Sequence, residues 1–342
     1  MIVDNYYRFK LMRLITSKWL SKPMLAAVEL ELADIISDKK VNIHWIANKT
    51  KTQPDLLYRL LRTLTSMGIF KELDDKNFVT TTMAKLLKKE ALGTMVLMFQ
   101  SDWHDKAWNM LTETIKTSTP GFELAHGCTA FTWFKNNQGA SESYNNANNA
   151  KVGMISQLFD KYKFKNINTI TDIGGGYGGL LIPILKKHIH LHGKIYDLGY
   201  LESKAIDKIN EHNLADRCTF IKGDFLNDIP VESDAYILSN ILHDWNDDQC
   251  NRILKNCYNI MKQESILFIV EMIVPEGNGA SISKFMDLEV LVMGGGKERT
   301  KKEFTHLLHS VNFKVKKISK KKHNYNIIEC TKISGNNFEY KL

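Results

Sequence analysis

The first part of the chain is organised into apolar segments that are separated by polar residues and one hairpin-like stretch. Apolar segments over residues 24–36, 42–48 and 54–67 predict three helices, the third of which opens at Pro54. Residues 68–70 then lead into residues 71–79, where two short runs flank a polar turn and predict a β-hairpin. Three helices followed by a hairpin predict a winged-helix module.

The segments on either side of this module are also predicted to be helical. Residues 1–20 interleave charged and apolar positions, which predicts an amphipathic helix whose apolar face is buried against the partner in a dimer. Residues 86–161 predict helices that link the two halves of the chain and carry many aromatic residues. The Asn-rich residues 136–149 could form a flexible loop, but we favour a helix that lines a pocket. We therefore divide the chain into an N-terminal winged-helix domain, 1–95, and a second domain, 96–342, that begins with the helical linker.

The second half of the chain alternates short β-branched or apolar runs with helical segments. Strands are predicted at residues 167–170, 193–196, 218–221, 233–240 and 265–270. Helices are predicted at residues 180–187 and 247–261. The run 265–270 is apolar throughout, as expected for a central strand of a parallel sheet. This alternation predicts an α/β domain with a doubly wound sheet.

A glycine cluster follows the first of these strands, in the sequence TDIGGGYGGL at residues 171–180. Glycines adopt positive φ at low cost and lack the Cβ atoms that would keep a ligand away from the main chain. Gly174, Gly176 and Gly179 also satisfy the dinucleotide pattern G-x-G-x-x-G, so a dinucleotide cofactor is one possible ligand.

Three acids near this cluster favour a different cofactor. Asp172 stands just ahead of the glycines, where it could hold an ammonium group, whereas a pyrophosphate would gain little from a carboxylate there. Asp197 closes the next strand and suits a ribose diol, and Asp224 ends a further strand. These residues favour S-adenosylmethionine over a dinucleotide.

Ionisable residues follow the later strands and the last glycine run. His243 comes after the strand 233–240, Glu271 ends the run 265–270, and Glu298 follows three glycines, residues 294–296. Thr300 is expected to cap the following helix through Glu303. Ligands collect at the carboxyl ends of strands in open α/β sheets, so the site chemistry is expected there.

With these motifs in view, the chain resembles the S-adenosylmethionine-dependent O-methyltransferases. The branch in question contains plant caffeate and isoflavone methyltransferases, the vertebrate acetylserotonin methyltransferase and bacterial polyketide-tailoring relatives. The family's motifs appear in the family's order: DIGGGYG at 172–178, DL at 197–198, GDF at 223–225, HDW at 243–245, Glu271 before VP at 274–275, and GGKERT at 295–300. The resemblance implies a Rossmann-like methyltransferase sheet and an N-terminal winged-helix module that serves homodimerisation.

The resemblance also implies roles for single residues around the cofactor, S-adenosyl-L-methionine. Gly174, Gly176 and their neighbours would cradle the methionine part, with Asp172 close by. The remaining expected cofactor-binding residues are Asp197 and Leu198 for the ribose, Asp224 and Phe225 for the adenine, and Ser239.

The catalytic residues implied by the resemblance are His243 as general base, with Glu271 and Glu298 flanking its imidazole. A phenol has a pKa near ~10 and an imidazolium near ~6.5, so unassisted proton transfer would cost roughly 5 kcal/mol. Flanking carboxylates that favour the imidazolium and a nearby sulfonium would both reduce that cost. Glu271 could instead pair with a basic residue at its strand end, and Glu298 could form a surface ion pair beside Lys297 and Arg299.

Two departures from the family pattern bear on the acceptor. Plant members usually carry a lysine four residues before the catalytic histidine, whereas this chain has Ser239, which points to the bacterial or animal-like branch. Where the family commonly has a phenylalanine and a methionine, this chain offers residues 144–148, Tyr-Asn-Asn-Ala-Asn. Either a more polar pocket or a shifted alignment would account for this.

Composition and charge narrow the class of protein further. The 342 residues are 44% hydrophobic, ordinary for a globular enzyme, and 46 basic against 38 acidic residues give a mild net charge of +8. Acids on the predicted hairpin oppose nucleic-acid binding by the winged helix, so no nucleic-acid partner is expected. No apolar run approaches the ~20 residues of a membrane span, and the five cysteines are scattered, which favours reduced thiols and a cytoplasmic protein. No metal is expected, because no clustered metal-ligand pattern occurs.

The sequence therefore predicts an enzyme that methylates a hydroxyl of a small aromatic or polyketide-like acceptor. One alternative is a relative with another outcome, such as N-methylation or a cofactor-assisted decarboxylation or hydroxylation. Another is a winged-helix regulator that senses S-adenosylmethionine.

Overall fold

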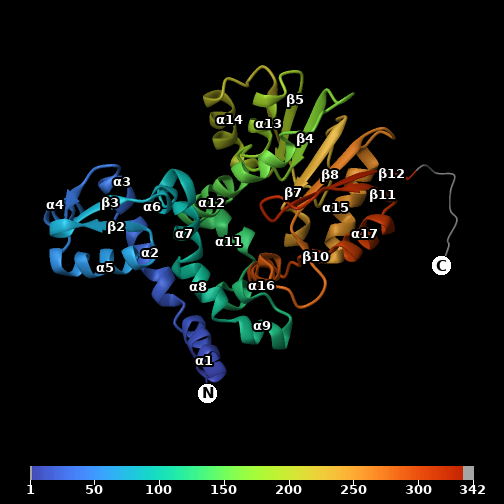
Figure 1. Cartoon of the computed structure of the whole chain (residues 1–342). Coiled ribbons are helices and arrows are strands. Elements are labelled where there is room, and N and C mark those ends of the chain that lie inside the picture. The colour runs from blue at the N-terminus through green and yellow to red at the C-terminus, as the bar shows by residue number, and fades with distance from the viewer. Residues whose placement is uncertain (1, 334–342) are drawn as a thin grey trace. The chain divides into compact units, whose positions relative to one another are not determined.

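The computed structural model describes residues 2–333, which form two compact units (Figure 1). Within the described residues, the first unit comprises 2–105 and 142–150, and the second comprises 106–141 and 151–333. Residues 142–150 belong to the middle of one long helix, so the first unit is not continuous in sequence. The division into independent domains 1–95 and 96–342 stays a prediction.

The first unit contains the winged-helix arrangement that the sequence predicts. Its helices are α1 (Ile2–Ile15), α2 (Lys18–Glu29), α3 (Leu32–Ile36), α4 (Ile43–Thr50), α5 (Pro54–Ser66), α6 (Thr82–Leu86) and α7 (Thr94–Phe99), with a π turn at Lys89–Gly93. Its three-stranded antiparallel sheet has the order β1-β3-β2, built from β1 (Val41–Asn42), β2 (Phe70–Leu73) and β3 (Asn77–Thr80), with a 3₁₀ turn η1 (Asp74–Lys76) between the last two. Buried leucines on one side of α5 pack against Phe70 and Phe78 of the hairpin.

Two helical predictions in this unit need correction. The single helix predicted over residues 24–36 is divided into α2 and α3, because Glu31 adopts the left-handed conformation with a φ of 52°. The N-terminal helix α1 is not amphipathic, since its exposed apolar residues point in all directions around the axis: Tyr6, Tyr7, Phe9, Leu11, Met12, Leu14 and Ile15.

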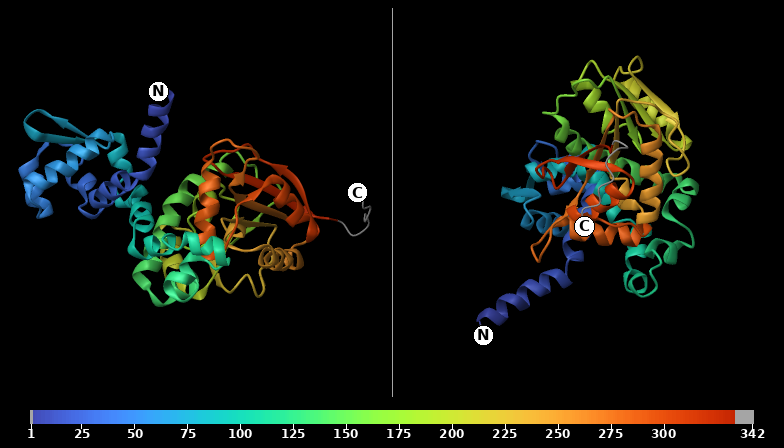
Figure 2. Two further views of the ribbon diagram at one scale, coloured as in Figure 1. Left: turned by 90° about the horizontal axis from the view of Figure 1, so that it is seen from below. Right: turned by 90° about the vertical axis from the view of Figure 1, so that its right-hand side faces the viewer.

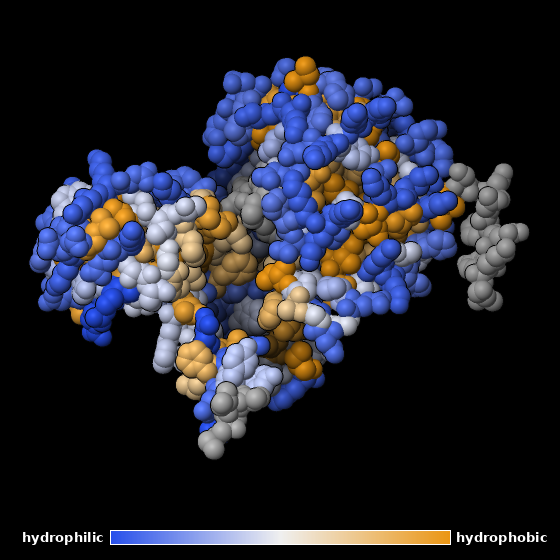
Figure 3. All heavy atoms as spheres, viewed as in Figure 1, coloured by the Kyte–Doolittle hydropathy of each residue, from blue (hydrophilic) through white to orange (hydrophobic). Residues whose placement is uncertain are grey.

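Helix α1 projects away from the other elements of its own unit (Figure 2). Each of the seven apolar side chains named above is at least 53% exposed. Figure 3 shows orange and pale atoms among blue ones in the region that Figure 1 labels α1.

The second unit is built around a seven-stranded sheet with the order β11-β12-β8-β7-β4-β5-β6. The strands β4 to β8 of this sheet run parallel. At one edge β12 runs antiparallel to β8, and β11, which is antiparallel to β12, runs in the same direction as β4 to β8. The bounds are β4 (Thr169–Ile173), β5 (His192–Asp197), β6 (Cys218–Lys222), β7 (Ala235–Ser239), β8 (Ile266–Glu271), β11 (Phe313–Ile318) and β12 (Asn326–Lys332).

Helices cover both faces of this sheet, as a doubly wound fold requires (Figure 1). One face is covered by α13 (Leu181–Lys187) and α14 (Glu202–Glu211), and the other by α15 (Asp247–Ile260) and α17 (Lys301–Ser310). Successive residues of a strand enter opposite cores, as Ile237 and Leu238 do. The predicted capping box of Thr300 and Glu303 opens α17.

The remaining elements are mostly helices that lead up to the sheet. They are α8 (Asp102–Trp108), α9 (Leu111–Thr117), α10 (Gly121–His126), α11 (Ala130–Asn136), α12 (Gln138–Ser156) and α16 (Ile282–Gly294). The Asn-rich stretch therefore forms a helix, α12, and not a loop. Short elements complete the fold: the 3₁₀ turns η3 (Gln157–Phe159), η4 (Gly199–Leu201) and η5 (Leu242–Asp244), and the paired strands β9 (Ile273–Val274) and β10 (Arg299–Thr300).

Candidate active site

The glycine cluster forms the turn between β4 and α13. Gly174, Gly176 and Gly178 have φ values of 71°, 56° and 83°, which favour glycine over any other residue. A Cβ atom on Gly174 would lie 2.3 Å from Ile241 Cδ1, so this backbone approaches the end of β7 too closely for a side chain. Pro183 lies in the first turn of α13, where its missing N–H costs no intrahelical hydrogen bond.

Asp172 lies directly beneath this turn and is buried. Its Oδ2 atom has no hydrogen-bond partner, and a Cβ atom on Gly175 would lie 2.9 Å from it. Burial, helped by the neighbouring charge of Asp197, raises the pKa of Asp172 to about 8. A buried carboxylate is stable in ionised form only next to a cation or several donors, so Asp172 is suited to a positively charged ligand group.

Asp197 ends the adjacent strand and closes the same turn from the other side. Its Oδ2 accepts a hydrogen bond from the Gly176 N–H at 2.7 Å, and its Oδ1 accepts one from the Leu198 N–H at 2.7 Å. Burial raises the pKa of Asp197, and these two hydrogen bonds oppose the rise. The carboxylate is therefore fixed against the glycine turn.

The other expected cofactor residues follow β6 and β7. Asp224 accepts hydrogen bonds from the Leu226 N–H and the Asn227 amide, each at 2.9 Å, and so caps its own turn. A Cβ atom on Gly174 would lie 3.4 Å from the Phe225 ring, which places that ring beside the glycine turn. Ser239 ends β7. Because β4, β5, β6 and β7 are parallel and in register, all these residues lie at the carboxyl ends of the strands, on the same side of the sheet's long axis.

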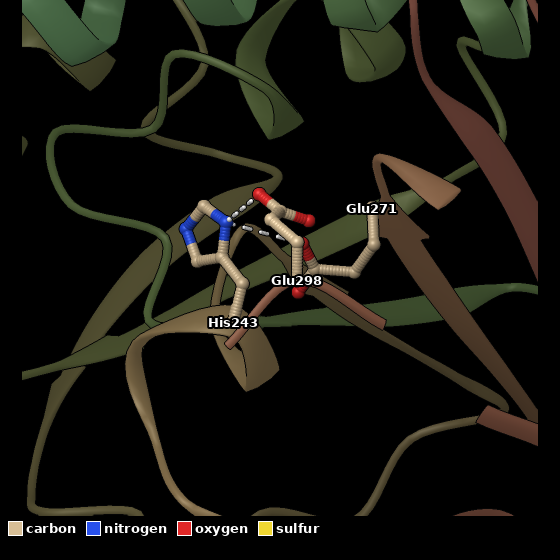
Figure 4. A group of neighbouring side chains, drawn as sticks. All are labelled: His243, Glu271 and Glu298. Atoms are coloured by element: carbon tan, nitrogen blue, oxygen red, sulfur yellow. Dashed lines mark hydrogen bonds and ion pairs between the residues drawn. The ribbon is translucent and has the colours of Figure 1, made fainter. Parts of the chain in front are cut away.

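His243 lies on η5, directly after β7, and two glutamates meet its ring (Figure 4). Its Nδ1 lies 2.8 Å from Glu298 Oε1 and 3.6 Å from Glu271 Oε2. Because carboxylates only accept hydrogen bonds, Nδ1 is the donor, and a neutral His243 carries its lone pair on Nε2. Figure 4 shows Nε2 on the side of the ring that faces away from both glutamates.

The two glutamates are held in different ways. Glu271 Oε1 accepts hydrogen bonds from the Ile241 N–H at 3.1 Å and the Leu242 N–H at 3.0 Å, so this carboxylate fixes the turn that leads to His243. Glu298 is positioned by its own N–H, which donates to Asp287 Oδ1 at 2.9 Å. Both carboxylates are buried, so Glu298 is not in a surface ion pair. Lys297 pairs instead with Glu303.

The charges around His243 change its proton affinity. Burial lowers the pKa of His243, but the negative charges of Glu271, Asp244 and Glu298 outweigh this effect and raise the pKa to about 9. Asp244 Oδ1 lies 3.5 Å from Nε2. The imidazole is therefore a much stronger base than a solvent-exposed histidine.

The sequence did not predict the structural roles of two residues at this site. Arg299 is fully buried and bonds to backbone carbonyls around His243, and Asp287 anchors the Glu298 backbone. Their positions in the sequence are only weak signals of a role at the site: Arg299 directly follows Glu298, and Asp287 is an acid on the apolar helix α16. A guanidinium that binds main-chain oxygens cannot be recognised from spacing alone.

Aromatic side chains of the linking helices extend the site. The Phe131 ring stacks on Trp245 at 5.9 Å, and Phe225 meets Trp245 edge-on at 6.0 Å. Trp245 therefore contacts both helix α11, through Phe131, and the carboxyl ends of the strands, through Phe225. Residues 144–148 lie on α12, and their place in an acceptor pocket stays a prediction.

Comparison with known proteins identifies the fold and the family. A model of the O-methyltransferase domain matches residues 108–314, and a model of the O-methyltransferase dimerisation domain matches residues 12–90. The chain belongs to the O-methyltransferase family. It is thus an enzyme that methylates small molecules with S-adenosylmethionine as cofactor.

Individual relatives cover nearly the whole chain. The phenazine O-methyltransferase PhzM of Lysobacter antibioticus is 31% identical over 94% of this chain and 96% of its own length. A phenazine-1-carboxylate N-methyltransferase of Pseudomonas aeruginosa is 26% identical over 90% of this chain and 92% of its own.

Solved structures agree with this assignment. The crystal structure of LaPhzM has a TM-score of 0.90 and 31% identity over 96% of this chain and 99% of its own. An O-methyltransferase from neocarzinostatin biosynthesis, solved with S-adenosylmethionine and 2-hydroxy-5-methyl naphthoic acid, has a TM-score of 0.76 and 25% identity over 92% of this chain and 96% of its own.

Two further observations concern metals and membranes. Among the described residues, one group of three potential metal ligands lies within 4.8 Å, and it consists of His243, Glu271 and Glu298. The same residues already form the imidazole–carboxylate hydrogen bond and hold two backbone N–H groups. Within residues 2–333, no helix is long and apolar enough to cross a membrane.

Proposed function

We propose that this protein transfers the methyl group of S-adenosylmethionine to a hydroxyl of a small aromatic or polyketide-like molecule, with His243 as general base. The observation that carries the proposal is the buried His243–Glu298 pair at 2.8 Å, which leaves Nε2 as the proton acceptor (Figure 4). Such an arrangement is suited to taking a proton from a hydroxyl that must become a nucleophile.

The residues along the sheet edge fit the charge of the cofactor. Asp172, which is buried with an unpartnered oxygen, would accept a hydrogen bond from the ammonium group of the cofactor. Asp197 and Leu198 would hold the ribose, and Asp224 and Phe225 the adenine. The glycine turn with Gly174 and Gly176, together with Ser239, would line the methionine part. The bound cofactor supplies an electrophilic methyl group on a sulfonium cation.

The pKa of His243 determines how much the site helps proton transfer. From a phenol of pKa ~10 to a histidine of pKa ~6.5, the transfer costs roughly 5 kcal/mol, at about 1.36 kcal/mol per pKa unit. With the pKa of His243 at about 9, the same transfer to the neutral ring costs only roughly 1 kcal/mol, and this gain applies in full at a pH above about 9, where the ring is neutral. Against the opposing effect of burial, the carboxylates of Glu271, Asp244 and Glu298 therefore give a net reduction of roughly 3 kcal/mol in the cost of transfer to the neutral imidazole. Holding the acceptor oxygen in line with the methyl carbon contributes much of the remainder.

N-methylation is the main competing outcome, because one relative of this chain is an N-methyltransferase. A neutral amine already carries the lone pair that attacks, so it does not need a base before methyl transfer. That reaction therefore does not include the free-energy cost of removing a proton from a phenol. Methyl transfer to amines would thus be insensitive to loss of His243.

The decisive experiment is methyl transfer by the wild type and by His243→Ala to phenols of different pKa. We expect His243→Ala to lower kcat by on the order of 10²- to 10⁴-fold with phenols of high pKa, and cofactor affinity to be nearly unchanged. His306→Ala, an exposed histidine on α17, is the matched control. Wild-type rates for His243→Ala on weakly acidic phenols would contradict the general-base role. Product analysis by mass spectrometry separates methylation from decarboxylation or hydroxylation.

We also propose that the protein is a homodimer. The match to the family's dimerisation domain and the exposed apolar residues of α1 support this proposal. A titration of DNA at physiological salt tests the alternative of a winged-helix regulator, and we expect no specific binding.

A further inference from the structure

Arg299 is a buried charged side chain with no part in the reaction described above. Its side chain is 1% exposed, and its guanidinium binds four oxygen atoms. One terminal nitrogen donates to the Leu242 carbonyl at 2.8 Å and to the Lys297 carbonyl at 3.2 Å. The other donates to the Trp245 carbonyl at 3.0 Å and to Asp247 Oδ1 at 2.7 Å, and Nε also donates to Asp247 Oδ1, at 3.0 Å.

These oxygens lie in two segments of the chain, the one that contains His243 and the one that contains Glu298. Leu242 directly precedes His243, and Lys297 directly precedes Glu298. A single guanidinium nitrogen therefore bridges the residue before the base to the residue before its carboxylate partner. The Trp245 carbonyl lies at the far end of η5, so Arg299 holds the turn on both sides of His243.

Two backbone features show that the same segments are packed tightly. The Lys297 N–H donates to the His243 carbonyl at 2.8 Å. A Cβ atom on Gly296 would lie 2.0 Å from that carbonyl oxygen, so only glycine permits this approach. The hydrogen bond between His243 and Glu298 thus depends on the alignment of two backbone segments that are 55 residues apart in sequence.

We propose that Arg299 is a positioning residue for the methyl-transfer reaction, because its guanidinium fixes the His243 turn against the Glu298 segment and so holds the imidazole–carboxylate hydrogen bond in place. This inference rests on the proposed function of His243. Arginine is required because it offers five N–H donors in a planar fork, whereas lysine offers three donors at a single point.

The charges around the imidazole determine which substitution is informative. His243 faces Glu298 and Glu271 at Nδ1 and Asp244 at Nε2, while Arg299 lies behind the turn beside the Cys250 thiol. Replacing Arg299 by a neutral residue would remove a positive charge as well as the hydrogen bonds. Arg299→Lys keeps the charge and removes the fork, so it isolates the effect of geometry.

The test compares Arg299→Lys with Arg217→Lys. Arg217 binds the carbonyls of Leu185 and Leu191 in the same unit, but at the end of the sheet away from His243, and so controls for the general effect of losing such a guanidinium. Three quantities are measured on the full-length protein. The first is the pKa of the His243 ring by NMR titration, with the signal assigned by its absence in His243→Ala, and the second is kcat with a phenol. Cofactor affinity is measured by calorimetry with S-adenosylhomocysteine.

We expect Arg299→Lys to lower the pKa of His243 by about one unit and, at a pH above about 9 where the ring is neutral in both proteins, to lower kcat by roughly tenfold, with cofactor affinity within about twofold of the wild type. Arg217→Lys should lower the melting temperature without moving the pKa of His243. An unchanged His243 pKa in folded Arg299→Lys would overturn the proposal. The titration needs no acceptor, so it gives an answer even if the proposed acceptor chemistry is wrong.

A second variant serves if Arg299→Lys does not fold. Asp247→Asn weakens the guanidinium's carboxylate anchor, and the Asp247 side chain is 62% exposed, so the fold should tolerate this change. Its control is Asp248→Asn in the same first turn of α15. We expect a smaller change in the same direction for Asp247→Asn than for Arg299→Lys. If Asp247→Asn and Asp248→Asn leave the His243 pKa equal, the proposal is wrong.

Discussion

Replacing Glu298 by glutamine removes one negative charge from the imidazole while keeping the shape of the side chain. The amide oxygen of glutamine can still accept the hydrogen bond that Nδ1 donates at 2.8 Å, so the ring should keep its orientation. What the variant loses is the stabilisation of the imidazolium that forms when His243 takes a proton. Glu298→Gln therefore separates the charge of the carboxylate from its role in holding the ring.

The magnitude follows from the proton affinity of His243. Its pKa of about 9 exceeds the ordinary 6.5 because three carboxylates outweigh the effect of burial. The combined effect corresponds to about 3 kcal/mol, and Glu298 makes the shortest contact of the three. Removing its charge should lower the pKa of His243 by roughly one to two units. At a pH above about 9, where the ring is neutral in both proteins, this should lower kcat by up to roughly 10- to 100-fold for a phenol of pKa ~10.

The assay is methyl transfer at saturating cofactor to a series of phenols of falling pKa. The loss in Glu298→Gln should shrink as the phenol becomes more acidic, because an acidic phenol needs less help from the base. Glu276→Gln, in an exposed ion pair with Lys302, is the matched control and should behave as the wild type. The reasoning is refuted if Glu298→Gln loses the same factor of kcat with every phenol, since a uniform loss would indicate displaced geometry and not weakened basicity.

The remaining predictions concern the cofactor edge, a metal and the dimer. Asp172→Asn should raise the melting temperature above pH 8 by a few degrees. The pKa of Asp172 is raised from 3.8 to about 8, so the wild type loses stability as the pH rises between those two values, and asparagine avoids this loss. The variant should also bind S-adenosylmethionine roughly tenfold or more weakly, and unchanged cofactor affinity by calorimetry would refute the role of Asp172. Micromolar S-adenosylmethionine or S-adenosylhomocysteine should raise the melting temperature of the wild type by mass action and NAD should not, so stabilisation by NAD alone would contradict the assignment of the site. Methyl transfer should be unaffected by EDTA, and loss of activity that Mg²⁺ or Zn²⁺ restores would show that His243, Glu271 and Glu298 bind a metal. Sedimentation should give a dimer, and deletion of residues 1–20 should lower its stability, whereas a compact monomer at micromolar concentration would refute the homodimer.

The sequence alone predicted much of the fold, and it named candidate site residues whose roles stay predictions. Glycine spacing after a β-branched run predicted the turn at residues 174–178, since only glycine tolerates the positive φ values found there. The ordered motifs from Asp172 to Thr300 predicted the sheet, and local capping preferences predicted the start of α17. These features depend on neighbouring residues, so they can be recognised in the linear chain.

The tertiary structure decided the features that depend on distant residues. The sequence left Glu298 open as a surface ion pair, because its neighbours Lys297 and Arg299 are charged, but the fold buries it against His243 and directs Lys297 to Glu303. The raised pKa of His243 results from three acids on separate segments, and the bridging role of Arg299 results from carbonyl groups, which every residue carries. Helix α1 is not amphipathic as predicted, because apolar residues occupy all sides of its axis. The break between α2 and α3 depends on the positive φ of Glu31, which the sequence pattern does not indicate. Local pattern fixes which elements form, whereas burial and charge at the site arise from contacts between segments that the sequence keeps far apart.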